Sequence, residues 1–219
     1  MIEPANICTK SPSRNPLPSR ANSGQWRCDL LPLICCSLLG VGSQAADPPK
    51  ILTGHNASSI SVAWSPGGKR LASGSSDKTV KIWNLKTGKV LKTFNGHSHY
   101  VYCVDWNPDG TKLASSSYDR TVKIWNTKSG KLLLTLKGHN NAVMSVDWSP
   151  DGKQLVTGSQ DKMVKVWNAT DGSLLRTCKG HSNLIISAQW SPDGKHIASG
   201  GFDNIVRVWD TTADFQSKN

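Results

Sequence analysis

Short apolar runs alternate with turn-forming residues along the chain from about residue 51 onward. In one stretch, β-branched, aromatic and aliphatic residues gather in four runs, at 101–106 (VYCVDW), 112–117 (KLASSS), 121–126 (TVKIWN) and 131–136 (KLLLTL). Turn-forming residues separate these runs, for example at 108–110 (PDG) and 129–130 (SG). No segment has the 3.6-residue apolar stripe of an amphipathic helix. The pattern therefore predicts four consecutive antiparallel β-strands and no helix.

The same pattern recurs along residues 51–219 with a fixed period of 42 residues. A Gly-His pair opens each copy, at His55, His97, His139 and His181. One tryptophan of each copy precedes Ser-Pro or Asn-Pro, at Trp64, Trp106, Trp148 and Trp190, and a second precedes Asn or Asp, at Trp83, Trp125, Trp167 and Trp209. A four-stranded sheet is too small to be stable alone, so repeated sheets of this kind bury their faces against one another. The sequence thus predicts an all-β protein of packed sheets.

The Gly-His to Trp-Asp pattern at this spacing resembles the WD-repeat β-propeller family, and the resemblance covers residues 51–219. It implies four recognisable four-stranded antiparallel blades arranged around a central channel. Members of the family usually have about seven blades. Four repeats therefore leave three possibilities open: a partial propeller, a small strained ring, or one half of a propeller formed by two chains.

Closure of the propeller depends on the last repeat, in which only TTADFQSKN follows Asp210. These residues show no alternating pattern, so we expect the last blade to lack a fourth strand of its own. Residues 50–53 (KILT) occupy the register of a fourth strand ahead of the first Gly-His pair. They could complete the last blade and fasten the two ends together. Otherwise a second copy or a partner propeller is expected to cover the bare edges.

The resemblance also implies one hydrogen-bonded tetrad in each blade, made of a His, a Ser or Thr, an Asp and a Trp. Every member is present, and the four sets are His55, Ser73, Asp77 and Trp83; His97, Ser115, Asp119 and Trp125; His139, Thr157, Asp161 and Trp167; and His181, Ser199, Asp203 and Trp209. An imidazole, a hydroxyl, a carboxylate and an indole N–H satisfy one another's hydrogen bonds in such a chain. We interpret the tetrads as structural fastenings of the turn between the second and third strands.

A Ser, a His and an Asp in contact are also the parts of a hydrolase triad. Repetition argues against catalysis, because a catalytic site needs one cluster facing a cleft, whereas four copies serve something that every blade needs. The sequence shows no unpaired couple of carboxylates, no metal-ligand cluster and no glycine-rich phosphate loop. We therefore expect no catalytic residue, no cofactor, no metal and no enzymatic activity.

Positions that differ between repeats are the places where partner choice can reside. The resemblance puts three positions of each repeat on the top face around the channel, namely the residues three and five after the Gly-His histidine and the residue before the tetrad Asp. From these positions we take as candidate partner-binding residues Ser58, Ser76, Tyr100, Tyr102, Tyr118, Gln160, Leu184 and Phe202. The other residues at these positions are Ile60, Ala142, Met144 and Ile186. The alternative is that Tyr102 and its equivalents Ile60, Met144 and Ile186 fill the space between blades.

All three tyrosines of the chain, Tyr100, Tyr102 and Tyr118, fall at these positions in the second repeat. Tyrosine is common at binding hot spots because it combines a large apolar area with a polar tip and few rotatable bonds. Residues 96–103 (GHSHYVYC) also resemble the aromatic blade of the WD-repeat subunit of histone methyltransferase complexes, in which aromatic rings grip an arginine. This resemblance implies that arginine-containing peptides are among the partners.

The function predicted from these features is that of a non-catalytic scaffold, a subunit of a larger complex that binds peptide segments of other proteins on its top face. The alternative is a subunit of an RNA-processing or chromatin complex that contacts nucleic acid through a basic surface, since the net charge is +11. Recurring cations such as Lys81 and Lys123 favour solvated blade edges over a nucleic-acid groove, because no stacking aromatics are interleaved with them. No membrane partner is expected.

Residues 1–50 differ from the repeats, because they are rich in Ser, Pro and Asn at first and show no strand or helix periodicity. We predict a disordered N-terminal extension there. Its apolar segment at 30–41 is too short to span a bilayer. The segment ends near Ala45 in a pattern that signal peptidase cuts, but Asp29 and the long stretch before it argue against a signal peptide. The six cysteines show no disulfide or zinc spacing, so we expect the cytoplasm, the nucleus or both.

Overall fold

The structure, a computed structural model, describes residues 49–212. Every regular element in this part of the chain is a β-strand, which confirms the all-β expectation. No segment of it forms a helix of the length and apolarity needed to cross a membrane. The apolar segment at 30–41 and nearly all of the extension predicted at 1–50 lie outside the described residues.

The strands form four antiparallel sheets, which we call the first to fourth blades in chain order. The first blade contains β1 (Ser59–Trp64), β2 (Arg70–Ser75), β3 (Thr79–Asn84) and β4 (Val90–Asn95). The second contains β5 (Val101–Trp106), β6 (Lys112–Ser117), β7 (Val122–Asn126) and β8 (Leu132–Leu136). The third contains β9 (Val143–Trp148), β10 (Gln154–Ser159), β11 (Val164–Asn168) and β12 (Leu174–Cys178). The fourth contains β13 (Ile185–Trp190), β14 (His196–Gly201) and β15 (Val206–Asp210).

Within each blade the strands lie in chain order, and each pairs antiparallel with the next. The strands predicted at 101–106 and 112–117 match β5 and β6, while those predicted at 121–126 and 131–136 begin one residue later, at Val122 and Leu132. The backbone N–H of Thr121 donates to Asp119 Oδ1 at 3.0 Å, as that of Thr79, the first residue of β3, donates to Asp77 Oδ1. The hydrophobic pattern therefore located the strands of this blade to within one residue.

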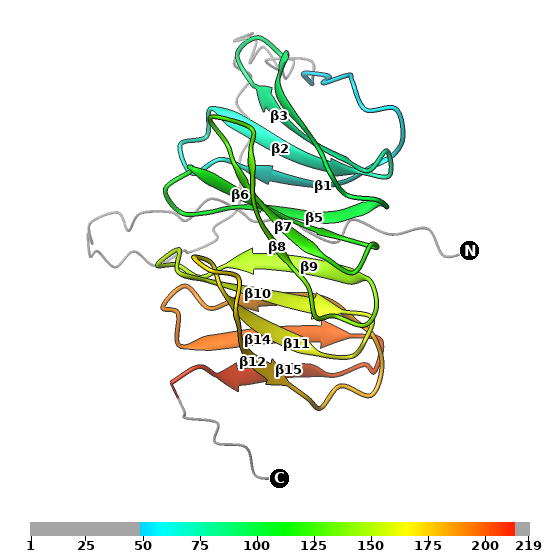
Figure 1. The fold of residues 1–219 in the computed structure, drawn as a ribbon, viewed down its shortest axis with the longest axis vertical. Coiled ribbons are helices and arrows are strands. Elements are labelled where there is room, and N and C mark those ends of the chain that lie inside the picture. Colours follow the sequence, from blue (N-terminus) through cyan, green and yellow to red (C-terminus); the bar gives the residue numbers. More distant parts are fainter. Residues whose placement is uncertain (1–48, 213–219) are drawn as a thin grey trace, which may run out of the picture. The chain divides into compact units, whose positions relative to one another are not determined.

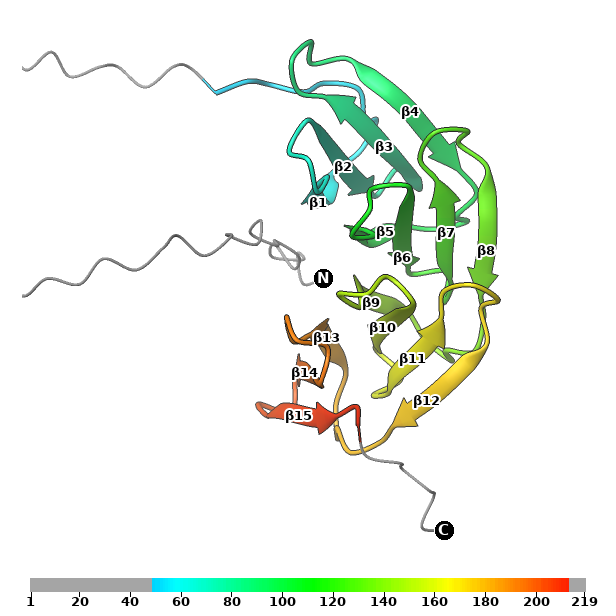
Figure 2. The same ribbon diagram turned by 90° about the vertical axis from the view of Figure 1, so that its left-hand side faces the viewer.

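Successive blades pack against one another through their first strands. β1 contacts β5, β5 contacts β9, and β9 contacts β13. Figure 2 shows these four strands on the inner side of an arc, with β4, β8 and β12 on its outer side. This radial order is that of a propeller, but the sheets do not close into a ring. Of the three possibilities left by the sequence, the single chain forms the partial propeller.

The core consists of three clusters of buried apolar side chains, each lying between two consecutive blades. Between the first two blades, Val80 and Ile82 of β3 pack with Val101, Val104 and Trp106 of the second blade. Side chains at the same repeat positions build the other two clusters. Figure 1 shows the blades following one another in chain order, so each interior blade buries both of its faces.

The fourth blade has three strands, and the only neighbour of β15 in the described residues is β14. Residues 213–219, on which the expectation about a fourth strand of the last repeat mostly rests, lie outside the described residues. Residues 50–53, which could have completed that blade, form no strand, and the Ile51 side chain is 79% exposed. The two ends of the repeat region are therefore not fastened together in the single chain.

Candidate functional site

The second blade shows how a tetrad is built. The Trp125 Nε1–H donates to Ser115 Oγ at 2.8 Å, and His97 Nε2 lies 2.8 Å from the same hydroxyl oxygen. On its other side, His97 Nδ1 lies 2.8 Å from Asp119 Oδ2. The indole can only donate, so the Ser115 hydroxyl hydrogen points to His97 Nε2 and the His97 Nδ1–H points to the carboxylate. The chain of donors thus runs from tryptophan through serine and histidine to aspartate.

The other three blades repeat this arrangement. The same three hydrogen bonds measure 2.7–2.9 Å in each of them. The resemblance therefore assigned all four sets of residues to positions where their side chains meet. Each tetrad joins the second and third strands of its blade, the turn between them and the loop that precedes the first strand.

The tetrad aspartate also binds the backbone of two turns. Asp119 Oδ2 accepts the Ser98 N–H at 3.0 Å, and its Oδ1 accepts the N–H and the hydroxyl of Thr121. Burial by itself raises the pKa of Asp119, but the hydrogen bond and charge of His97, together with the bonds from Thr121 and Ser98, hold it well below its usual range. The carboxylate is therefore ionised under all ordinary conditions.

The turn that each aspartate holds has an unusual backbone conformation. The residue after the aspartate has a positive φ of 63–72° in every blade, at Lys78, Arg120, Lys162 and Asn204. Left-handed φ values are uncommon for residues other than glycine. Hydrogen bonds from the turn to the tetrad carboxylate compensate for this conformation, which explains why an aspartate recurs there. The cations at three of these positions, Lys78, Arg120 and Lys162, are thus turn residues.

The tetrads do not have the accessibility that a hydrolase triad needs. Ser115 and Thr157 are fully buried, and Ser73 and Ser199 are each 3% exposed. Each hydroxyl oxygen also accepts an indole N–H, which removes a lone pair from nucleophilic attack. The geometry supports the structural interpretation of the tetrads. In residues 49–212 no group of three or more His, Cys, Asp or Glu side chains is arranged to hold a metal ion.

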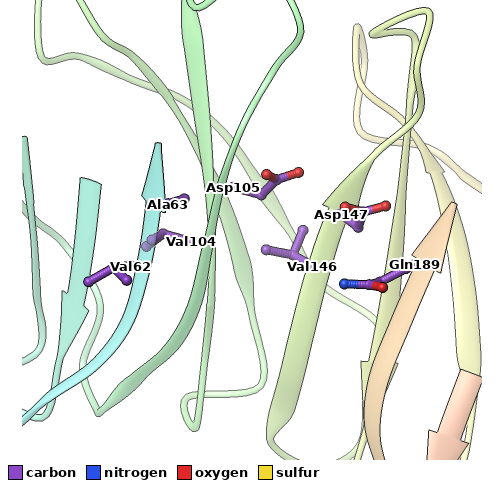
Figure 3. A pocket seen from close by; sticks show the side chains of 7 residues that line it. All are labelled: Val62, Ala63, Val104, Asp105, Val146, Asp147 and Gln189. Carbon is purple, nitrogen blue, oxygen red and sulfur yellow. The ribbon is translucent and has the colours of Figure 1, made fainter. Parts of the chain in front are cut away.

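The hollow between the first strands is too small for a ligand. Its volume is about 10 Å³, roughly the space of one water molecule. Figure 3 shows Asp105, Asp147 and Gln189 on successive first strands beside it. Asp105 Oδ2 accepts the backbone N–H of Trp148 at 2.9 Å, so this carboxylate joins two blades. The inner strands therefore serve packing between blades.

The variable positions come together in pairs at one edge of each blade. The backbone N–H of the residue before the tetrad Asp donates to the carbonyl of the residue three after the tetrad His, at 2.9 Å in every blade. The pairs are Ser76 with Ser58, Tyr118 with Tyr100, Gln160 with Ala142, and Phe202 with Leu184. Two residues far apart in each repeat thus present neighbouring side chains where the first strand begins and the second ends.

These candidates differ in exposure. Tyr100, Tyr118 and Phe202 are 42%, 43% and 47% exposed, and Ser58 is exposed too. The remaining candidates are half-buried, namely Ser76, Tyr102, Gln160 and Leu184. Among the positions for which a packing role was the alternative, Ile60 and Met144 are buried and Ile186 is half-buried. Ala142 is also buried, so blade three presents only Gln160.

The exposed tyrosines belong to an aromatic cluster with a fourth ring, which we define as His99, Tyr100, Tyr102 and Tyr118. The His99 ring centroid lies 4.3 Å from that of Tyr100 and 4.3 Å from that of Tyr118. Tyr102 lies 6.2 Å from Tyr118 between centroids, at the buried end of the cluster. Burial, followed by the nearby Tyr118 and Tyr100, raises the pKa of Tyr102 above its ordinary value. The Tyr102 phenol is therefore uncharged near neutral pH.

His99 is the member that the sequence analysis missed. Its Nδ1 accepts the Tyr100 N–H at 2.9 Å, which fixes the orientation of the ring. In the third and fourth blades the side chains of Asn141 and Asn183 make the same hydrogen bond to the next residue. A signal was present, because the second blade alone places an aromatic ring at this position.

The comparisons with known proteins agree with this geometry. The family model described as "WD domain, G-beta repeat" matches residues 46–84, 88–126, 130–168 and 172–210. The chain belongs to the WD-repeat family. Each family repeat begins with the outer strand of the preceding blade, because 88–126 contains β4 and β5 to β7. Four repeats therefore give three complete blades, a three-stranded fourth blade and one leading segment.

Two curated proteins resemble parts of this WD-repeat region. Vegetative incompatibility protein HET-E-1 of Podospora anserina is 57% identical over 37 residues, which are 17% of this chain and 3% of that protein. Probable serine/threonine-protein kinase PkwA of Thermomonospora curvata is 43% identical over 56 residues, which are 23% of this chain and 7% of that protein. The matched segments span only a small part of either relative's length.

Proposed function

We propose that this WD-repeat protein is a non-catalytic scaffold that binds peptide segments of other proteins, as a subunit of a larger complex in the cytoplasm or nucleus. The single observation that carries the proposal is the aromatic cluster of His99, Tyr100, Tyr102 and Tyr118 at the edge of the second blade. WD-repeat domains generally bind other proteins, and this cluster is the feature that distinguishes the second blade from the other three.

The cluster has the properties of a binding hot spot. Tyr100 and Tyr118 expose about two fifths of their surface although both are large aromatic residues. Rings that pack against one another lose little entropy when a partner binds. His99, between them, is oriented by the Tyr100 backbone. A pre-organised aromatic surface of this kind provides an anchoring point for one side chain of an extended peptide.

An arginine side chain fits this surface chemically. Guanidinium groups stack on aromatic faces, and the protein itself provides one example, since Arg70 Cζ lies 4.8 Å from the centroid of the Trp106 ring. Arg120 lies two residues after Tyr118, and the chain carries a net charge of +11. Acidic residues beside the anchoring arginine would complement these charges. We therefore propose peptides in which an arginine is flanked by acidic residues.

Peptide arrays probed with the purified full chain test this function. The array contains arginine-acidic peptides, the same peptides with lysine or alanine in place of arginine, and scrambled controls. We expect binding that depends on arginine and that is lost in the variant Tyr100→Ala/Tyr118→Ala. Lys128→Ala, in the exposed turn of the same blade, is the matched control and retains binding. Equal binding by the double variant would contradict the proposed site.

A further inference from the structure

The three interior contacts between blades follow one plan. The third strand of one blade presents two apolar side chains, and the first strand of the next blade covers them. Val80 and Ile82 are covered by residues of the second blade, including Val104 and Trp106. The remaining two contacts use the equivalent positions. Each contact therefore consists of a covered face on one blade and a covering face on the next.

Hydrogen bonds from backbone N–H groups to side chains of the preceding blade accompany this packing. Ser145 Oγ accepts the Ala188 N–H of the next blade at 3.0 Å, and Asp147 Oδ2 accepts the Trp190 N–H at 2.7 Å. Ser61 and Asp105 make the same bonds to their neighbouring blades at 3.2 and 2.9 Å. The first strand of each blade thus supplies side-chain acceptors for backbone donors of the following one.

In the fourth blade, the face that corresponds to the covered face of the other blades is exposed. Val206 and Val208 are 76% and 67% exposed, whereas their equivalents Val80 and Ile82 are at most 1% exposed. Such large apolar side chains on an uncovered sheet face mark an interaction surface. The face lies beside the uncovered edge of β15.

A glycine of the same face gives an independent measure of the missing neighbour. A Cβ added at Gly74 would lie 2.7 Å from Val101 Cγ1, and one added at Gly158 would lie 2.7 Å from Ile185 Cγ2, both in the following blade. A Cβ at the equivalent Gly200 meets no atom within 4 Å. The last blade therefore keeps the small residue that a following blade requires.

The first blade exposes the complementary covering face. Val62 and Trp64 are 39% and 50% exposed, whereas Val104 and Trp106, at the same positions of the second blade, are 2% and 5% exposed. Figure 1 shows the first blade, which contains β1, at one end of the row of blades and the fourth blade, which contains β15, at the other. The two faces are thus the two halves of one interior contact, on opposite ends of the repeat region.

The polar groups of the two faces also match. Ser187 and Gln189 occupy the positions of Ser145 and Asp147, so each offers a side-chain oxygen as acceptor. The backbone N–H groups of Val62 and Trp64 occupy the donor positions. Gln189 lies with Asp147 on neighbouring inner strands in Figure 3. A face that ends in Gln189 therefore retains an uncharged acceptor suited to one N–H donor.

The segment ahead of β1 has the repeat register of an outer strand, and the fourth blade has no outer strand within the described residues. Leu52 occupies the position of Phe94, Leu136 and Cys178, which are 2%, 2% and 8% exposed at the end of their outer strands. Leu52 itself is only half-buried, and Ile51 is 79% exposed. An apolar side chain in the register of an outer strand is thus available to pair with an uncovered β15.

We propose that a second copy of this chain is the partner of both faces. The first blade of each copy covers the fourth blade of the other, and residues 51–53 of each copy add the fourth strand beside the β15 of the other. The contact is head-to-tail, and two such contacts close the pair into one eight-bladed ring. Closure leaves neither terminal face exposed. Ser59 takes the place of Val101 and Ile185 in this contact, which leaves more room opposite Gly200 than interior contacts have.

The mass of the full 219-residue chain in solution, measured by sedimentation velocity and light scattering, tests this pairing. We expect twice the mass of one chain. Gly200→Glu places a charged side chain where the single chain has open space, so the fold stays intact and the mass falls to that of one chain. Gly67→Glu is the matched control, because a Cβ there also meets no atom within 4 Å, yet it lies in the exposed turn after β1. This control keeps the mass of two chains.

A disulfide between copies checks the register. In the first interior contact a Cβ on Gly74 lies 3.3 Å from Val101 Cβ, close to the roughly 3.5–4.5 Å between Cβ atoms of a disulfide. We therefore expect the double variant Ser59→Cys/Gly200→Cys to form covalent dimers on oxidation, and neither single variant to do so. A folded wild-type monomer, a Gly200→Glu variant that keeps the double mass, or a double variant that stays uncrosslinked overturns the proposal.

Discussion

Two neighbouring residues of the second blade, Tyr118 and Asp119, show opposite uses of the same turn. Asp119 belongs to a tetrad that all four blades share, and its side chain is buried and fully hydrogen-bonded. Tyr118 belongs to a cluster found in this blade alone, and it is 43% exposed. The residues that recur in every repeat hold the blade together, whereas the residue that differs between repeats at the same turn is exposed to solvent. Partner choice can therefore change without altering the fold.

The largest expected effect concerns the buried end of the tetrad. Trp125→Ala removes an indole that is 2% exposed and leaves the Ser115 hydroxyl without its donor. Truncation of a buried tryptophan costs about 3–5 kcal/mol of unfolding free energy. Urea unfolding followed by circular dichroism measures this loss. Trp209→Ala, in the half-covered last blade, is expected to cost less, and an equal or larger loss would contradict the importance of the neighbouring blade.

A smaller loss of stability is expected from Asp119→Ala. The change leaves the His97 Nδ1–H and the Ser98 and Thr121 N–H groups without their acceptor. A lost set of such bonds costs roughly 1–3 kcal/mol. The melting temperature should fall while the affinity of the remaining folded protein for a bound peptide is unchanged. Weaker binding by fully folded protein would mean that the tetrad takes a direct part in recognition.

The exposed cluster should respond in the opposite way. Tyr118→Ala or Tyr100→Ala is expected to weaken peptide binding by roughly 2 kcal/mol, as truncation of a hot-spot tyrosine does. The melting temperature stays nearly constant, because about two fifths of each side chain is already exposed. Calorimetric titration and thermal unfolding of the same samples separate the two quantities. Variants that melt early but bind normally when folded would show that the cluster is packing.

Acid should destabilise the protein through the tetrad aspartates. Burial raises the pKa of Asp77, but hydrogen bonds from Thr79, Asn56 and His55 outweigh it and hold this pKa well below its usual range. A carboxyl whose pKa is lowered on folding stabilises the protein above the unfolded pKa of about 3.9, and this contribution is lost as the pH falls toward the folded value. Urea midpoints should therefore change little from this cause between pH 7 and about 5 and decline below about 4. Asp77→Asn should make that decline shallower, and an unchanged decline would assign it to other groups.

The sequence located the strands and the tetrads because each depends on residues that recur in every repeat. It predicted bare edges at the ends of an open arc, but not which apolar side chains are exposed there. Val206 occupies the same repeat position as Val80, yet it is 76% exposed because burial at this position comes from the following blade. Periodicity describes a residue's place within a repeat and contains no information on whether another repeat covers it.

The candidate site was predictable in part for the same reason. The resemblance to the WD-repeat family assigned the paired positions of each repeat to one face, and the repeat register then placed Tyr100 and Tyr118 together in the second blade. His99 could not be recognised as their partner by register alone, because the equivalent side chains Asn141 and Asn183 have only the local hydrogen-bonding role. Which of these positions are exposed depends on packing between blades: Tyr118 is 43% exposed, whereas Met144, at the position of Tyr102, is buried.

The smallest expected effect is that of salt on peptide binding. If the basic surface were the recognition site for RNA, each neutralised phosphate would release counterions, and affinity would fall about tenfold or more over a few-fold rise in salt. Aromatic contacts in the cluster are short-range and lose little when charges are screened, so the dissociation constant of a bound peptide should change by less than about threefold between about 50 and 200 mM salt. Fluorescence anisotropy with a labelled peptide and with a labelled single-stranded RNA measures both dependences on the same protein. Sub-micromolar RNA binding at physiological salt that survives Tyr100→Ala/Tyr118→Ala would contradict the peptide-binding function, because it would assign recognition to the shared basic edges.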